Sequence, residues 1–228
     1  MQQSILAIFP HPDDESFVSA GTLIHHVKNG DMVTLVCATL GQMGRRMGKP
    51  FFATRETLPH VREKELRQAC HIIGIHDLRL WKMQDKMLQF RDKMYLAGSV
   101  LQVILETEPA IIYTFYPKHG VHPDHDALSA ATISAVEQLP LTKRPIVFGA
   151  AITKNRYEIL GKPTIEMDVS DVFREKVSAL KAHKSQTSHI VDQLNAVTAN
   201  QLNGIKQIPE AYIKEKYWVY DFGTDSVS

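Results

Sequence analysis

The sequence predicts an α/β protein with a mostly parallel β-sheet that has helices on both of its faces. Two observations predict this class. Short apolar runs alternate with segments of helical periodicity, and two polar turns of similar sequence each follow such a run. Strands and helices that alternate in this way form a parallel sheet that helices cover. At 228 residues the chain fits one domain, so we expect a single domain over residues 1–228 with a flexible tail at its end.

The order of the elements follows from apolar spacing and turn residues. Pro10 bounds the first apolar run, and Asn29-Gly30 ends the first clear helix with residues typical of a helix C-cap. Pro109 separates a later helix from the run that follows it. We expect strands at residues 5–9, 33–38, 78–81, 110–115, 146–151, 164–169 and 217–222. We expect helices at residues 20–27, 58–73, 97–105, 124–135 and 173–180, the last of which runs into residues 182–186, with weaker helical signals over 187–209.

Bulk composition indicates a globular protein with a small-molecule ligand. Hydrophobic residues make up 44% of the chain and charged residues 22%, which is ordinary for this class. The net charge of +1 predicts neither a nucleic acid nor a membrane as partner. No apolar run has the roughly 18 residues of a membrane span, and the N-terminus lacks a signal-sequence pattern. Two cysteines, Cys37 and Cys70, are expected to be reduced and buried, which suits the cytoplasm.

Two turns carry the candidate chemistry. The first reads His-Pro-Asp-Asp-Glu over residues 11–15, and the second reads His-Pro-Asp-His over residues 122–125. Each turn follows an apolar run, and ligands bind beyond the carboxyl ends of the strands in parallel sheets. We therefore expect the two turns to be neighbours in space. Alternatively, the acidic residues only form a first helical turn that faces the positive end of a helix.

A catalytic zinc site takes three protein ligands and leaves a position for water. His11 and Asp14 can supply two ligands from the first turn, and His125 can supply the third. Two imidazoles and one carboxylate leave a strongly polarised water on the cation. Iron(II) accepts the same ligands, so we expect Zn²⁺ with Fe²⁺ as the alternative.

Three further residues of the turns fit the remaining steps of metal-assisted amide hydrolysis. Asp13 can take the proton of the water as a general base. His122 can stabilise a developing oxyanion or protonate a leaving amine, and Asp124 can hold the His122 imidazole in one orientation. Most other histidines are expected in surface or core roles, namely His25, His26, His60, His71, His76 and His189. The roles of Tyr116, His119 and His183 are left open.

These residues resemble the LmbE/PIG-L superfamily of zinc-dependent N-acetylglucosamine deacetylases. The resemblance rests on the two turns, on Arg62-x-x-Glu65 with Ala69 and Gly74 after it, and on residues 182–186. It covers about residues 4–186. The segments 41–50, 55–59 and 113–125 are most similar to the branch of bacillithiol biosynthesis (BshB-type, second paralogue).

The resemblance implies a Rossmann-like fold and a set of site residues. His11, Asp14 and His125 would bind zinc, Asp13 would be the general base, and His122, oriented by Asp124, would be the acid or electrophilic group. It also implies a homo-oligomer. The implied substrate is N-acetylglucosaminyl malate, which the enzyme would convert to glucosaminyl malate and acetate.

Substrate contacts are expected from four cations. Arg62 matches the family arginine that contacts substrate, here the malate carboxylate, or else forms a helical salt bridge. Arg45 and Arg46, in a glycine-spaced basic loop, and Lys118 would suit a dicarboxylate, or else are solvated loop charges. Two rival functions remain: an amidase that cleaves bacillithiol S-conjugates, and a non-catalytic protein that binds a sugar or a metal.

Overall fold

Over the described residues, seven strands form one sheet in the order β3-β2-β1-β4-β5-β7-β6. The computed structural model describes residues 2–202 and 209–223. Strands β1 to β5 pair in parallel, whereas β7 is antiparallel to both β5 and β6. The predicted mostly parallel α/β class is confirmed, with an antiparallel edge that the sequence did not indicate. The strands are β1 (Ser4–Phe9), β2 (Met32–Thr39), β3 (Asp77–Met83), β4 (Ile111–Phe115), β5 (Ile146–Ala150), β6 (Ile165–Asp168) and β7 (Lys214–Val219).

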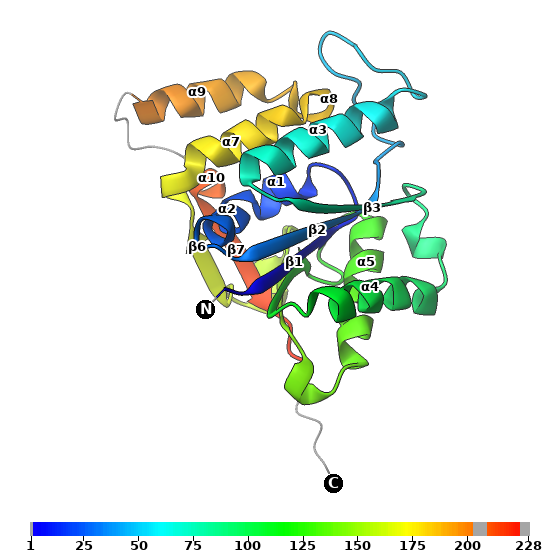
Figure 1. The fold of residues 1–228 in the computed structure, drawn as a ribbon. Coiled ribbons are helices and arrows are strands. Elements are labelled where there is room, and N and C mark those ends of the chain that lie inside the picture. Colours follow the sequence, from blue (N-terminus) through cyan, green and yellow to red (C-terminus); the bar gives the residue numbers. More distant parts are fainter. Residues whose placement is uncertain (1, 203–208, 224–228) are drawn as a thin grey trace.

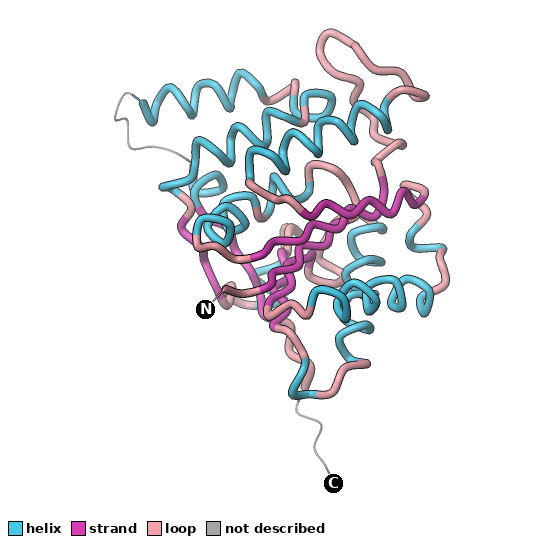
Figure 2. Tube along the Cα trace, in the orientation of Figure 1, coloured by secondary structure: helices cyan, strands magenta, loops and turns pink. Residues whose placement is uncertain are grey.

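Helices cover both faces of the sheet (Figure 1). Helices α2, α3 and α7 lie on one face with α9 outside them, and α4 and α5 lie on the other, as the tube in Figure 2 also shows. The helices are α1 (Asp14–Val18), α2 (Ala20–Lys28), α3 (Leu58–Ile73), α4 (Lys93–Thr107), α5 (Pro123–Glu137), α6 (Arg156–Leu160), α7 (Phe173–Ala182), α8 (Lys184–Thr187), α9 (Val191–Leu202) and α10 (Glu210–Ile213). Three short 3₁₀ turns lie at Leu88–Phe90, Leu141–Lys143 and Ser170–Val172.

Burial on both faces explains why the central strands are apolar throughout. In β1, Ile5, Ala7 and Phe9 pack in the core beneath α2, α3 and α7, whereas Leu6 and Ile8 pack in the core beneath α4 and α5. Successive strand residues point to opposite faces, so a strand covered on both sides must be apolar at every position.

Several predicted boundaries differ from the observed ones. The third strand runs over Asp77–Met83 and is longer than predicted, and the last strand begins at Lys214, three residues earlier than expected. The weak helical signals over 187–209 correspond in part to α9, while residues 203–208 lie outside the described part of the chain, as do the tail residues 224–228. The helix predicted from Ala97 begins at Lys93, because Asp92 caps it by accepting a hydrogen bond from Tyr95 N at 2.8 Å.

The topology brings the two polar turns together. Strands β1 and β4 are adjacent, with Ile5 opposite Ile111 and Ala7 opposite Tyr113. The carboxyl ends of both strands therefore lie on the same side of the sheet, and the turns that begin at His11 and His122 lie beyond these ends. Within the described residues, no helix is both long enough and apolar enough to cross a membrane.

Candidate metal centre and its crevice

Three side chains converge where β1 and β4 end. The Nδ1 atom of His11 lies 3.2 Å from Nε2 of His125 and 3.4 Å from Oδ2 of Asp14. The Nε2 atom of His125 lies 3.3 Å from Oδ1 of Asp14. Ligand atoms about 2.1 Å from a tetrahedral zinc ion lie about 3.4 Å from one another. The three side chains therefore have the spacing that a single tetrahedral cation requires.

Hydrogen bonds fix which nitrogen each imidazole directs at this centre. His125 Nδ1 donates to the Gly120 carbonyl at 2.7 Å, and the ring stacks on Phe115 with centroids 4.0 Å apart. His11 Nε2 lies 3.1 Å from Asp85 Oδ1 and 3.4 Å from Asp124 Oδ2. The outer nitrogen of each ring is thus occupied as a donor, so the inner nitrogen carries the lone pair that a cation needs.

The charge distribution also favours a cation. Burial disfavours the protonated imidazole of His11, but hydrogen bonds with Asp124, Asp14 and Asp85 raise the pKa of His11 well above its usual value. Burial would raise the pKa of Asp14, yet the positive charge of His125 and hydrogen bonds from both histidines hold that pKa well below its usual range. The buried carboxylates thus draw protons onto the imidazoles, and a divalent cation supplies the same positive charge.

A second group of potential ligands lies beside the first. In the described part of the chain, His11, His122 and His125 offer ligand atoms within 4.8 Å of one another, and so do His11, Asp85 and Asp124. The His122 ring lies 4.8 Å from the His11 ring and 5.3 Å from the His125 ring, centroid to centroid. The histidines and carboxylates therefore form one contiguous cluster around His11.

Asp124 makes contacts that differ from the expected one. Its carboxylate accepts hydrogen bonds from the backbone N–H groups of Lys86 at 2.6 Å and Leu88 at 3.1 Å, and it faces His11. Its link to His122 is instead through the backbone, because the Asp124 N–H donates to His122 Nδ1 at 3.1 Å. His122 is the N-cap of α5.

Asp85 was not identified from the sequence. It follows β3, and besides contacting His11 its Oδ2 accepts a hydrogen bond from Met43 N at 2.8 Å. Asp85 is only 4% exposed, so its carboxylate interacts with the groups of this cluster rather than with solvent. The available signal was its position after the third apolar run, because that strand also ends at the edge where the two turns lie.

Asp13 lies beside the three converging side chains in an unusual backbone conformation. Its φ is 98°, which is rare for a residue with a side chain, and its N–H donates to Glu15 Oε2 at 3.1 Å. The Asp13 carboxylate lies 3.2 Å from Nη2 of Arg62. Burial raises the pKa of Asp13 to about 6, against the opposing effect of the Arg62 charge. A carboxylate with this pKa is suited to general base catalysis near neutral pH.

The buried Arg62 supports this arrangement. Its guanidinium donates to the carbonyls of Gly41, at 2.9 Å, and of Pro12, in addition to its contact with Asp13. Gly41 must be a glycine, because a Cβ atom there would lie 1.8 Å from Nη1 of Arg62. Although Arg62 lines the crevice, most of its hydrogen-bonding capacity is used within the protein.

His183 is fully buried behind α1. Its Nε2 lies 2.7 Å from Oε1 of Glu15, whose other oxygen accepts the Asp13 N–H. Burial disfavours the charged ring, but the charge and hydrogen bond of Glu15 raise the pKa of His183. His183 therefore reaches the crevice only through Glu15.

The crevice has a volume of about 300 Å³. Of the sequence-predicted residues it brings together His11, Asp13, Asp14, Arg45, Arg62, His122 and His125. Asp124 lies beneath it, whereas Arg46 and Lys118 are exposed and do not line it. Tyr116 and His119 also lie outside the lining; the His119 ring is held by Thr153, with Nδ1 2.7 Å from Oγ1. Met43, Gly44, Asp85, Lys86 and Gln186 complete the lining.

Comparisons with known proteins agree with this chemistry. The family model described as PIG-L, GlcNAc-PI de-N-acetylase, matches residues 6–136. A protein of Bacillus cereus named probable N-acetyl-alpha-D-glucosaminyl L-malate deacetylase 2 is 44% identical over 224 residues, which cover 96% of this chain and 99% of that protein.

Two solved structures share the fold. The N,N'-diacetylchitobiose deacetylase of Pyrococcus horikoshii superposes with a TM-score of 0.71 at 20% identity, covering 96% of this chain and 84% of that one. The 4-carboxy-2-hydroxymuconate hydratase of Pseudomonas putida also reaches 0.71, at 17% identity over the whole of both chains. The fold therefore carries more than one reaction, so function must be argued from the site.

Proposed function

This chain belongs to the PIG-L/LmbE family of de-N-acetylases, and we propose that it is a zinc-dependent hydrolase that removes the N-acetyl group from N-acetylglucosaminyl malate. The substrate is proposed from the name of the Bacillus cereus relative, which matches this chain over nearly its whole length. The observation that carries the reaction type is the convergence of His11 Nδ1, His125 Nε2 and the Asp14 carboxylate, through contacts of 3.2–3.4 Å, with the separate Asp13 carboxylate beside them. Binding alone needs no such base, so this carboxylate favours a hydrolase over a binding protein.

His11 Nδ1, Asp14 and His125 Nε2 would hold the cation. When bound, zinc supplies a Lewis acid for the acetamide carbonyl and for water. Asp85 and Asp124 keep the His11 ring in the tautomer that leaves Nδ1 free, and the Gly120 carbonyl does the same for His125 Nε2. Iron(II) is the alternative metal, because it accepts the same nitrogen and oxygen donors.

Asp13 would act as the general base. With a pKa near 6 it is ionised at neutral pH and can take the proton of the attacking water, then return it to the leaving amine. Arg62 orients the carboxylate without contributing a proton. The role proposed for Arg62 is therefore positioning of Asp13 rather than a direct grip on the malate carboxylate.

His122 would stabilise the oxyanion that develops on the acetyl carbonyl. Its Nδ1 accepts the Asp124 N–H, so in the neutral ring the proton must lie on Nε2. Burial, together with the charges of His11 and His125, lowers the pKa of His122, which keeps the ring neutral. A neutral imidazole with a fixed Nε2–H is a hydrogen-bond donor to a developing negative charge.

The decisive experiment is acetate release by the purified, zinc-loaded protein. N-acetylglucosaminyl malate and methyl N-acetylglucosaminide would be compared, with a bacillithiol S-conjugate as a third substrate. The proposal requires one metal per chain and the highest kcat/KM for the malate glycoside. Faster cleavage of the S-conjugate would assign the chain to the amidase alternative, and no release of acetate from any glycoside by the metal-loaded protein would exclude the deacetylase.

Two further properties accompany the proposal. We propose a homo-oligomer, as the family resemblance implies, and a cytoplasmic location, which suits the free, buried Cys37 and Cys70. Light scattering coupled to size-exclusion chromatography would give the oligomeric state, and a monomer at micromolar concentration would contradict that part.

A further inference from the structure

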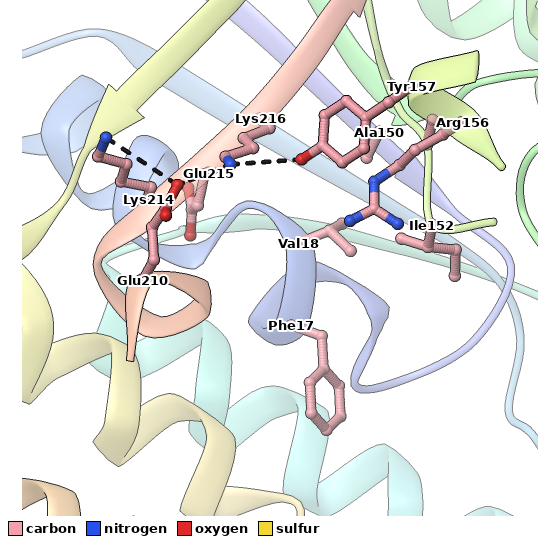
Figure 3. A pocket seen from close by; sticks show the side chains of 11 residues that line it. Phe17, Val18, Ala150, Ile152, Arg156, Tyr157, Glu210, Lys214, Glu215 and Lys216 are labelled. Atoms are coloured by element: carbon pink, nitrogen blue, oxygen red, sulfur yellow. Dashed lines mark hydrogen bonds and ion pairs between the residues drawn. The ribbon is translucent and has the colours of Figure 1, made fainter. Parts of the chain in front are cut away.

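A second cavity lies where β5 and β7 meet the loop that precedes α6 (Figure 3). Its volume is about 320 Å³, and its walls include Phe17, Val18, Ile152, Arg156, Tyr157 and Lys216. Within the part of the chain that the structure describes, no residue lines both this cavity and the catalytic crevice. The proposed deacetylation mechanism uses none of the residues that line this cavity.

The cavity lies one helical turn from the candidate base. Phe17 N donates to the Asp13 carbonyl at 3.0 Å, so the two residues are four apart around the start of α1. Asp13 lines the crevice and Phe17 lines the cavity. The first turn of α1 therefore joins a residue that lines the crevice to one that lines the cavity.

A second connection ties the cavity to the crevice. Ile152 N donates to the His119 carbonyl at 2.9 Å, and His119 Nδ1 lies 2.7 Å from Thr153 Oγ1. The loop that leads into Arg156, the first residue of α6, is thus attached to the loop that leads into His122. The segment of Ile152, which lines the cavity, is therefore held against the segment that leads into His122, which lines the crevice.

Arg156 has unused capacity to bind an anion. Its Nη1 donates to the Thr153 carbonyl at 2.8 Å, and the guanidinium carbon lies 4.6 Å from the centroid of the Tyr157 ring. Across the described residues, no carboxylate forms an ion pair with it. By contrast, Lys216 lies 2.7 Å from Glu210. A guanidinium offers five N–H donors in a planar fork that matches a carboxylate.

The remaining walls fit a carbon skeleton. Phe17 is 44% exposed and Ile152 is 41% exposed, and both line the cavity. Among the described residues of the lining, Glu215 is the only buried acid; it pairs with Lys176 at 2.8 Å and accepts hydrogen bonds from the backbone N–H groups of Gly21 and Thr22. The cavity therefore presents a cation without a counter-ion next to apolar surface.

We propose that this cavity binds the carboxylate-bearing aglycone of the substrate, while the acetamide of the sugar lies in the catalytic crevice. The proposal rests on the proposed function and adds a specificity site to it. Arg156 would pair with a carboxylate of the aglycone, and Phe17 and Ile152 would contact its carbon atoms. Selectivity for an acidic glycoside would then depend on Arg156, rather than on the exposed cations Arg46 and Lys118.

The test compares Arg156→Gln with Lys154→Gln, which removes an equal charge from an exposed residue two positions away. Arg156→Gln should lower kcat/KM for N-acetylglucosaminyl malate about 10–100-fold, which is the usual loss when one charged hydrogen-bonded partner is removed. The rate with methyl N-acetylglucosaminide should stay within about twofold, because that substrate has no carboxylate to lose. Lys154→Gln should change neither rate.

Arg156→Glu should lower the rate with the malate glycoside further and spare the methyl glycoside. Equal effects of Arg156→Gln on both substrates, or no effect on either, would overturn the inference while the wild-type enzyme still releases acetate. If Arg45→Gln loses the preference for the malate glycoside over the methyl glycoside and Arg156→Gln keeps it, the aglycone lies in the crevice instead. Failure of the wild type to deacetylate either glycoside would refute the proposed function itself.

Discussion

Replacement of Asp85 by asparagine tests the carboxylates behind His11. The Asp85 carboxylate receives two donors: His11 Nε2 at 3.1 Å and the Met43 N–H at 2.8 Å. An asparagine of nearly the same size has a single oxygen, so one donor must face the amide NH₂. Because the residue is only 4% exposed, water cannot replace the lost acceptor.

The loss should appear in metal affinity. Removal of such a supporting partner typically weakens metal binding about 10–100-fold. This corresponds to roughly 1.4–2.8 kcal/mol, because each tenfold change is about 1.4 kcal/mol. Competition with a chromogenic chelator would measure the zinc affinity of Asp85→Asn, and thermal unfolding of the metal-free protein would show that the fold is retained.

Asp92→Asn is the matched control. Asp92 is the exposed N-cap of α4, and asparagine caps a helix about as well as aspartate. This variant should bind zinc like the wild type. The reasoning is refuted if Asp85→Asn also binds zinc within about twofold of the wild type while its fold is intact.

Three other predictions concern the base, the His125 loop and the core. Asp13→Asn should retain one metal per chain but lose about 10²–10⁴-fold in kcat. Because the base must be ionised, the kcat/KM of the wild type should rise with pH through about 6. Any residual activity of Asp13→Asn should lack this rise. If Asp13→Asn shows the same pH profile as the wild type, Asp13 is not the base. Gly120→Ala should lower the metal content of the protein, because the added Cβ would lie 2.4 Å from the Cβ of His125. Atomic absorption would measure this content. One metal ion per chain in the variant would contradict the tight packing inferred there. Lys176→Met should lower the free energy of unfolding, measured with urea, by about 3–5 kcal/mol, because it leaves the buried Glu215 charge unpaired. A decrease below about 1 kcal/mol would show that this ion pair contributes little to stability.

The sequence carried the central part of the fold because buried parallel strands are apolar at every position. The run at residues 5–9 is such a strand, and its prediction needed no knowledge of its neighbours. The antiparallel part of the sheet, formed by β7 with its neighbours, is harder to predict from the sequence. Strand β7 alternates partly buried and buried residues over Lys214–Tyr217, and its antiparallel pairing with β5 depends on tertiary contacts that no local pattern encodes.

At the site, the sequence could indicate residue types and their positions at strand ends, but not the strand order. His11 and His125 meet across 114 residues because β4 inserts next to β1. Asp124 was assigned to His122 by closeness in sequence, whereas its carboxylate is turned to His11 by the N–H groups of Lys86 and Leu88. Those donors come from the segment after β3, and Asp85 lies in the same segment. The sequence alone does not show that this segment packs against His11, so it does not identify Asp85 as part of the site.

The location of zinc in crystals of the metal-loaded protein, from anomalous scattering at the zinc edge, tests the central claim most directly. The account predicts one peak per chain within about 2.0–2.2 Å of His11 Nδ1, an Asp14 oxygen and His125 Nε2. The described residues also offer the group His11, Asp85 and Asp124. A peak among those three, on the Nε2 side of the His11 ring, would contradict the proposed ligands and the role given to Asp13.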